Sequence, residues 1–262
     1  MDLGLHGKVV LVTGGSKGIG FACARGFAAE GARVAIASRD AAHLAAAAQR
    51  MHAEGIDVLT VAADLADSAQ AAQMVRTVEA ALGPIDVLVN SAGAARRTPP
   101  AELAAKHWHA AMDAKYFTYL HAIDAVLPGM AQRGAGAIVN VIGMGGKVAS
   151  PIHLPGGAAN AALMLATAGL ANAFAAQGVR INAVNPGLTA TDRLHEGFAA
   201  EARASGQPAS ELLQQRQRAL PMGRIAEPDE IADVVVFLAS RRASYVNGAI
   251  VAMDGGATAT VV

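Results

Sequence analysis

Short runs of β-branched residues alternate along the whole chain with alanine-rich segments of helical character. The segments between consecutive runs are a dozen or more residues long. Connections of that length suit crossover helices between parallel strands and are far longer than hairpin turns. The seven runs are KVVLVTGG (8–15), RVAIASRD (33–40), IDVLTVAADL (56–65), IDVLVNSAG (85–93), GAIVNVIG (136–143), VRINAVNPG (179–187) and GAIVAMDGG (248–256). The sequence therefore predicts an α/β fold with a doubly wound, seven-stranded parallel sheet in a single domain over 1–262.

Residues 188–222 interrupt this alternation. The segment is long, polar and helical in character, and it stands between the sixth run and the last helical segment. Connections after strands of a parallel sheet lie at the edge where ligands bind. We therefore expect a helical lid near 188–222.

Composition excludes several classes of partner. The chain has 262 residues and zero formal net charge, with 21 basic and 21 acidic side chains and no Lys/Arg block, so a nucleic-acid partner is not expected. The N-terminus lacks a signal-peptide pattern, and we expect no segment that spans a membrane, hence a cytoplasmic protein. The single cysteine, Cys23, is expected to be buried and structural. His107 and His109 diverge on a helix and have no evident third partner, so no metal is expected.

A glycine-rich turn, TGGSKGIG, follows the first run at residues 13–20. Its glycines permit a tight turn and a close approach of the backbone to a ligand, and the helix that follows presents its N-terminus to a pyrophosphate. Because the turn joins a strand to a helix at the start of a βαβ unit, a phosphate cradle is favoured over a purely structural turn. The residues predicted to bind a dinucleotide here are Gly14, Ser16, Lys17, Gly18, Ile19 and Gly20.

The end of the second run indicates which dinucleotide binds. An acidic residue about twenty positions after the glycines would bind a ribose 2′-hydroxyl, but this sequence has Ser38 and Arg39 there. An arginine suits a 2′-phosphate, and Lys17 can add a second cation. We therefore expect NADP(H) in preference to NAD(H). The alternative is that both cations are merely solvated at the surface, since Asp40 follows directly.

The sequence resembles the short-chain dehydrogenase/reductase family over essentially its full length. The motifs that carry the resemblance are Thr13-Gly-x3-Gly-x-Gly20, Asp64-Leu65, Asn90-Ser-Ala-Gly93, Asn182, Pro186-Gly187 with Thr191, LPMGRIAEPDEIADVVVFLAS (220–240) and Asp254-Gly-Gly256. The resemblance implies a Rossmann-type sheet with the coenzyme across its carboxyl edge and, commonly, a homotetramer. It adds the following to the predicted coenzyme-binding residues: Asp64, Leu65, Asn90, Ala92, Gly93, Pro186, Gly187 and Thr191.

The same resemblance implies a proton relay that this sequence lacks. In the family a tyrosine exchanges the proton, a lysine four residues later lowers the pKa of that tyrosine, and a serine and an asparagine complete the relay. The matching positions read Gly156, Asn160, Gly143 and Lys115, in that order. The tyrosines of the chain are Tyr116, Tyr119 and Tyr245, and none has a lysine four residues later.

Two residues are candidates to take over the chemistry. Lys115 can place an ammonium where the missing groups would converge on a substrate oxygen, as a proton donor or a Schiff-base nucleophile. The alternative is that Lys115 only replaces the cation lost at Asn160 and bonds the nicotinamide ribose. His153 lies in the loop expected to flank the substrate and is a second candidate acid or base. The alternative is that it is an exposed surface histidine with no catalytic role, which is more common for a histidine in a loop.

The sequence is compatible with three functions. The first is an NADP(H)-dependent oxidoreductase with a non-standard proton donor acting on a small carbonyl or alcohol. The second is a non-redox lyase or isomerase that uses Lys115. The third is a coenzyme sensor, or an inactive subunit in a mixed complex with an active homologue. We favour the first, because the features that hold the nicotinamide coenzyme are retained.

Overall fold

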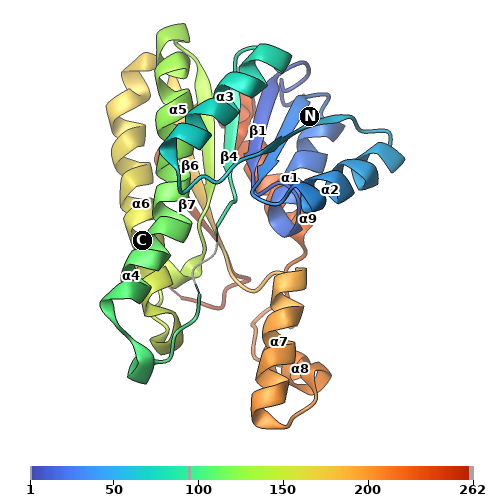
Figure 1. Cartoon of the computed structure of the whole chain (residues 1–262), viewed down its shortest axis with the longest axis vertical. Coiled ribbons are helices and arrows are strands. Elements are labelled where there is room, and N and C mark those ends of the chain that lie inside the picture. The colour runs from blue at the N-terminus through green and yellow to red at the C-terminus, as the bar shows by residue number, and fades with distance from the viewer. Residues whose placement is uncertain (1, 94–95, 260–262) are drawn as a thin grey trace.

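Seven parallel strands form one sheet in the computed structural model, which describes residues 2–93 and 96–259 (Figure 1). The strands are β1 (Val9–Thr13), β2 (Arg33–Ser38), β3 (Val58–Ala62), β4 (Val87–Asn90), β5 (Gly136–Val141), β6 (Val179–Pro186) and β7 (Ile250–Met253). Their order is β3-β2-β1-β4-β5-β6-β7, so the chain builds one half of the sheet outward from β1 and then crosses over to build the other. Each strand lies inside one predicted run, and the doubly wound, seven-stranded Rossmann-type sheet is confirmed.

Helices cover both faces of this sheet (Figure 1). One face carries α1 (Gly18–Ala29), α2 (Ala41–Ala53) and α9 (Pro228–Ala239), and the other carries α3 (Ser68–Leu82), α5 (Thr118–Arg133) and α6 (Leu154–Phe174). A short helix, α4 (Ala105–Ala111), leads into a π-helical turn, η2 (Met112–Phe117), that continues directly into α5.

The two cores follow from the alternation of side chains along each strand. In β1, Val10 and Val12 enter the core beneath α1, α2 and α9, whereas Val9 and Leu11 enter the core beneath α3, α5 and α6. Successive side chains of a strand point to opposite faces, so a strand covered on both faces must be apolar throughout. This explains why the runs are continuously hydrophobic.

The segment predicted as a lid forms two helices, α7 (Asp192–Ser205) and α8 (Ala209–Arg218). They follow β6 and project from the body of the molecule as an arm (Figure 1). A parallel bridge between Thr189 and Ala226 joins the two ends of the segment. The helical character is confirmed, and the covering of a substrate by this arm stays a prediction.

The helix α6 corrects one expectation. Within the described residues, the segment 151–177 is long and apolar enough to cross a membrane by length and composition, although we expected no such segment. Its apolarity comes largely from alanine and leucine, and polar residues such as Asn160 and Thr167 interrupt the run in the sequence. In the fold it lies against the sheet with Leu163 and Ala171 in the cores. Only 33% of its most apolar window is buried, so much of an apolar helix faces outward.

Arg180 of β6 connects the sheet to the end of α9. Its guanidinium donates hydrogen bonds of 2.7–3.4 Å to the carbonyl oxygens of Leu238, Ala239, Ser240, Ala243 and Val246. Burial lowers the pKa of this guanidinium, yet a cation at a helix C-terminus is favoured because the last carbonyls there have no partner in the helix. Since α9 packs on α1, this contact supports the helix that follows the glycine turn.

We predict that Arg180→Met lowers the free energy of unfolding by about 2–4 kcal/mol, because several buried carbonyls lose their donor at once. Urea denaturation measures the change. The matched control is Arg33→Met at the exposed start of β2, which should stay within about 0.5 kcal/mol of the parent chain. Equal losses in both variants would contradict the role given to Arg180.

Candidate active site

The glycine turn packs too closely against its surroundings to admit side chains. A Cβ atom on Gly14 would lie 2.7 Å from the Ser91 carbonyl oxygen and 2.8 Å from Ala92 Cα, and one on Gly20 would overlap the Gly14 carbonyl oxygen. The turn therefore brings the ends of β1 and β4 together at the carboxyl edge. Strand order reverses at this pair, which is where ligands of doubly wound sheets bind.

The first turn of α1 faces this edge. The helix begins at Gly18 and Ile19, and the first N–H groups of any helix have no partner within it, which suits an anion. Gly18 has a φ of +53°, and a Cβ atom there would lie 3.1 Å from Thr191 Cγ2. The arm thus starts beside the turn. Within the turn, Ser16 is buried and Lys17 is exposed.

A row of buried polar side chains crosses the sheet behind the turn. The Thr13 hydroxyl donates to Asn90 Oδ1 at 3.3 Å, Asn90 Nδ2 donates to Asn140 Oδ1 at 3.0 Å, and Asn140 Nδ2 donates to Thr167 Oγ1 at 3.0 Å. These bonds connect β1, β4, β5 and α6. Asn90 is fully buried, so its observed role is to hold the strand ends in place; its contact with a coenzyme stays a prediction.

Other predicted coenzyme residues follow β3 and β6 at the same edge. The carboxylate of Asp64 accepts the N–H of Ala66 at 3.1 Å, and Leu65 is buried beside it. Pro186 ends β6, and the N–H of Gly187 donates to the Met253 carbonyl at 3.0 Å. The predicted residues therefore share one edge of the sheet, as a bound dinucleotide requires.

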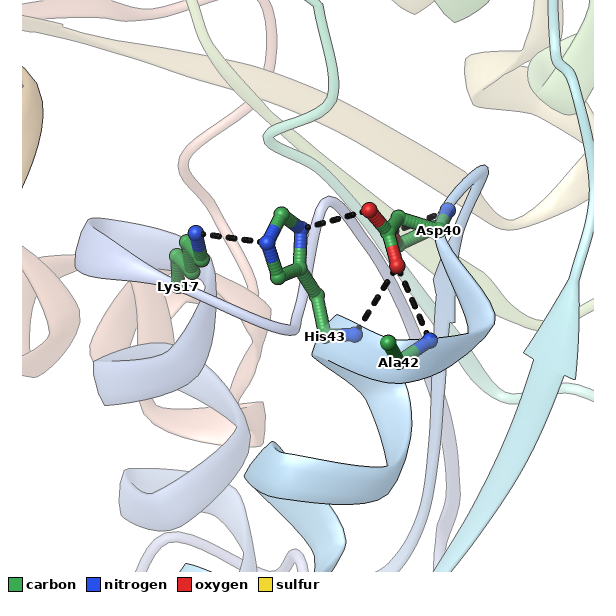
Figure 2. A network of polar contacts seen from close by, with 5 residues as sticks. Lys17, Asp40, Ala42 and His43 are labelled. Atoms are coloured by element: carbon green, nitrogen blue, oxygen red, sulfur yellow. Dashed lines mark hydrogen bonds and ion pairs between the residues drawn. The ribbon is translucent and has the colours of Figure 1, made fainter.

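Figure 2 shows the region where the ribose 2′-substituent is expected. Ser38 ends β2 and Arg39 follows it as an exposed residue. Asp40 caps α2: its Oδ1 accepts two backbone N–H groups of the first turn at 2.9 and 3.0 Å. The ring of His43 lies between Asp40 Oδ2, 3.3 Å from Nδ1, and Lys17 Nζ, 3.0 Å from Nε2. The glycine turn and the start of α2 are thus joined by side chains.

Close backbone packing continues at the end of β4. Gly93 has a φ of +89°, and a Cβ atom there would overlap the carbonyl oxygen of Ala114 in η2. The strand end therefore packs directly on this π-helical turn. Such turns are rare and often occur at functional sites. Here the turn carries Lys115.

Lys115 is buried and forms a compact cluster with two oxygen atoms. Its Nζ donates to Tyr119 Oη at 2.8 Å and to the Val141 carbonyl oxygen at 3.1 Å, and Tyr119 Oη donates to the same carbonyl at 2.6 Å. Burial raises the pKa of the Tyr119 phenol above its usual range, so this side chain stays neutral. Val141 is the last residue of β5, and the cluster therefore lies where β5 reaches the carboxyl edge.

The remaining candidate site residues lie at or near the turn that follows β5. Gly143 has a φ of +124°, its N–H donates to Asn185 Oδ1 at 3.3 Å, and a Cβ atom there would lie 3.6 Å from Asn160 Nδ2. A Cβ atom on Gly145 would lie 3.5 Å from the same nitrogen and 3.3 Å from His153 Cδ2. His153 and Asn160 thus converge on the short helix η3 (Met144–Gly146). Gly156 is buried in the first turn of α6.

Neither metal nor thiol chemistry has a structural basis in the part of the chain that the structure describes. No group of three or more His, Cys, Asp or Glu side chains in that part is placed to hold a metal ion. Cys23 is buried in α1, and burial raises the pKa of its thiol to about 12. A thiol with that pKa is protonated at neutral pH and is a poor nucleophile.

Known proteins match this chain along nearly its whole length. A family model described as enoyl-(acyl carrier protein) reductase matches residues 14–258. Gluconate 5-dehydrogenase of Gluconobacter oxydans is 34% identical over 257 residues, which is 98% of this chain and 97% of that protein. The chain belongs to the short-chain dehydrogenase/reductase family.

Two solved members of the family are similar in fold. L-sorbose reductase from Gluconobacter frateurii, complexed with NADPH and L-sorbose, has a TM-score of 0.93 and 32% identity, with full coverage of both chains. An NADPH-bound short-chain oxidoreductase of Pseudomonas aeruginosa PAO1, described as containing an atypical catalytic center, has a TM-score of 0.87 and 30% identity over 97% of this chain and 98% of that one.

Family membership is confirmed, while the replacement of the proton relay by Gly143, Gly156, Asn160 and Lys115 stays a prediction. Sequence reasoning missed Tyr119 as the partner of Lys115. The signal was present, because Lys115-x3-Tyr119 is the family's Tyr-x3-Lys spacing in reverse order and places both side chains on one helix face.

Two further residues of the site had no signal in the sequence. His43 contacts Lys17 only through the tertiary fold, and Asn185, although it precedes Pro186 in the chain, contacts Gly143 only through the fold.

We predict that Gly93→Ala lowers the free energy of unfolding by about 1–3 kcal/mol more than Gly83→Ala does. Both glycines have a φ near +90°, but nothing lies within 4 Å of a Cβ atom on Gly83. Thermal or urea denaturation of the two variants isolates the clash with η2. Equal destabilisation of the two variants would show that η2 shifts away from the added Cβ atom with no loss of folding free energy.

Proposed function

We propose that this chain is an NADP(H)-dependent oxidoreductase that interconverts a ketone and an alcohol, with Lys115 as its proton donor. The observation that carries the proposal is a buried lysine of η2 whose Nζ contacts the last carbonyl of β5, on the same edge of the sheet as the glycine turn. Gluconate 5-dehydrogenase and L-sorbose reductase are named for polyhydroxylated compounds, which supports a polyhydroxylated small molecule as substrate.

The residues at the carboxyl edge fit NADP(H). Gly14 and Gly20 leave the backbone free of side chains where a pyrophosphate would approach α1, and Lys17 and Arg39 can supply cations for a 2′-phosphate. Both solved relatives described above hold NADPH. When bound, the nicotinamide coenzyme supplies or accepts the hydride.

Lys115 supplies the proton in this mechanism. During reduction the substrate oxygen gains negative charge, and a positioned ammonium stabilises that charge and protonates the oxygen. Tyr119 and Val141 accept hydrogen bonds from Nζ as neutral oxygens and so orient the ammonium. A Schiff base would instead require the nitrogen to present a lone pair to a carbonyl carbon, and trapping with borohydride distinguishes the two roles.

Tyr119 positions Lys115 and does not donate the proton itself. Its O–H is directed to the Val141 carbonyl, and burial keeps the phenol neutral. His153 is the second acid or base of the proposed site. Its ring lies against η3 beside Asn160, on the loop that leads into α6, where it can exchange a proton with a substrate hydroxyl.

The assembly that we propose is a homotetramer in the cytoplasm. Much of the apolar helix α6 faces outward, and Leu165 on this side is 78% exposed. An exposed apolar surface of this extent is suited to burial against a second copy of the chain. Association with an active homologue is the alternative, and it would apply if this chain alone shows no turnover.

We predict that Lys115→Met lowers kcat for NADPH-dependent reduction of a ketose by about 10²–10⁴-fold, because the positioned acid is lost. Its Kd for NADPH should stay within a few-fold of the parent value. NADPH absorbance over a panel of ketoses measures turnover, and fluorescence titration measures binding. Lys106→Met, the same change at an exposed lysine of α4, is the control.

Other outcomes of this experiment separate the alternatives. Full turnover by Lys115→Met would overturn the role of Lys115. Treatment of the parent chain with borohydride and a candidate carbonyl compound tests the Schiff base. A stable adduct on Lys115 would favour the Schiff-base enzyme. NADPH binding without turnover in the parent chain would favour the sensor or the inactive subunit.

We predict that Leu165→Glu reduces the molar mass measured by light scattering at micromolar concentration, because a charge would be placed in an apolar interface. Ala46→Glu, on the exposed side of α2 across the sheet, should leave the mass unchanged. A parent chain that is already monomeric would contradict the homotetramer.

A further inference from the structure

Three polar side chains connect the start of α2 to the glycine turn (Figure 2). Lys17 Nζ lies 3.0 Å from His43 Nε2, and His43 Nδ1 lies 3.3 Å from Asp40 Oδ2. Lys17 and His43 are 26 positions apart in the sequence: Lys17 lies in the glycine turn directly before α1, and His43 lies in the first turn of α2. The contact therefore depends on how α1 and α2 pack.

The contact with Lys17 determines which ring nitrogen of His43 carries the proton. An ammonium group has donors only, so Nε2 must accept its hydrogen bond. The ring proton then lies on Nδ1, where it faces the carboxylate of Asp40. In this arrangement Nε2 accepts from Lys17 while Nδ1 faces Asp40 Oδ2 at 3.3 Å.

Asp40 is an acidic residue beside a site that we assign to an anion, and such a charge would ordinarily oppose binding. Here both carboxylate oxygens are engaged, one by backbone N–H groups of α2 and the other by the ring of His43. The backbone N–H of His43 is the main cause that holds the pKa of Asp40 below its usual range. Asp40 is therefore ionised at neutral pH, with its charge directed to the helix N-terminus and the ring.

We propose that His43, supported by Asp40, is a positioning residue that holds the Lys17 ammonium at the 2′-phosphate site and so sets the preference for NADPH over NADH. This inference rests on the coenzyme proposed above. An exposed lysine samples many rotamers, and binding a phosphate through it costs the entropy of ordering them. The His43 ring restricts Lys17 before the coenzyme arrives.

The inference separates two cations that look alike in the sequence. Arg39 is exposed at the end of β2 and acts on the 2′-phosphate through its own charge. Lys17 acts through a position that His43 and Asp40 define. NADH carries a hydroxyl in place of the phosphate, so its affinity should not depend on where the ammonium of Lys17 lies.

The test is a double-mutant cycle read by direct binding. Kd values for NADPH and NADH are measured by titration calorimetry or fluorescence for the parent chain, His43→Leu, Lys17→Met and the double variant. His43→Leu should weaken NADPH binding about fivefold, the upper range for an exposed polar pair, and leave NADH binding unchanged. In the Lys17→Met background the same change should have no further effect on NADPH.

Two further variants sharpen the test. His43→Gln retains an acceptor for Lys17 and should recover part of the NADPH affinity lost in His43→Leu. His52→Leu is the matched control, because His52 is on the same helix and also contacts an aspartate, Asp57, at 3.1 Å, but is not part of the chain to Lys17. It should change neither Kd.

Three results would overturn the inference: equal weakening of NADPH and NADH by His43→Leu, an equal effect with and without Lys17, or no effect. The proposed function can fail separately. A parent chain that binds NADPH tightly but reduces no ketose leaves the binding cycle interpretable and refutes only the oxidoreductase. A parent chain that binds neither coenzyme refutes the coenzyme site and this inference together.

Discussion

The row of buried amide and hydroxyl groups across the sheet is the interaction on which the site depends. Thr13, Asn90, Asn140 and Thr167 satisfy one another in a region without access to water. A buried polar group left without a partner is costly, so the strand ends that carry these residues can shift only together. The glycine turn lies at one end of this row, and the helix that carries Asn160 lies at the other.

The second constraint is a lysine in the interior beside that row. A buried charge is tolerated only where hydrogen bonds replace its hydration, and Tyr119 with the Val141 carbonyl supplies them. A leucine at position 115 could fill the same volume without this requirement. The cluster therefore constrains how η2 packs on the end of β5, and the proposed role of Lys115 depends on it.

The coenzyme end of the site is organised in the opposite way. Lys17, Asp40 and His43 are exposed, so their interactions are individually weak and act by orienting one another. Asp40, which in the sequence weakened the case for a 2′-phosphate, supports that case in the structure. Its carboxylate caps α2 and holds the ring that contacts Lys17.

The sequence by itself determined the seven strands, their parallel arrangement and the position of the glycine turn. These features depend on local patterns: a strand buried on both faces is continuously apolar, and a tight turn against a neighbouring strand requires glycine. It also identified Lys115 as an unusual residue. Only the tertiary structure decided that the Val141 carbonyl contacts Lys115 and that the His43 ring contacts Lys17. Each pair is brought together by packing between segments far apart in the chain. The outward face of α6 was likewise decided by packing, since alanine-rich helices carry little periodic contrast between buried and exposed sides.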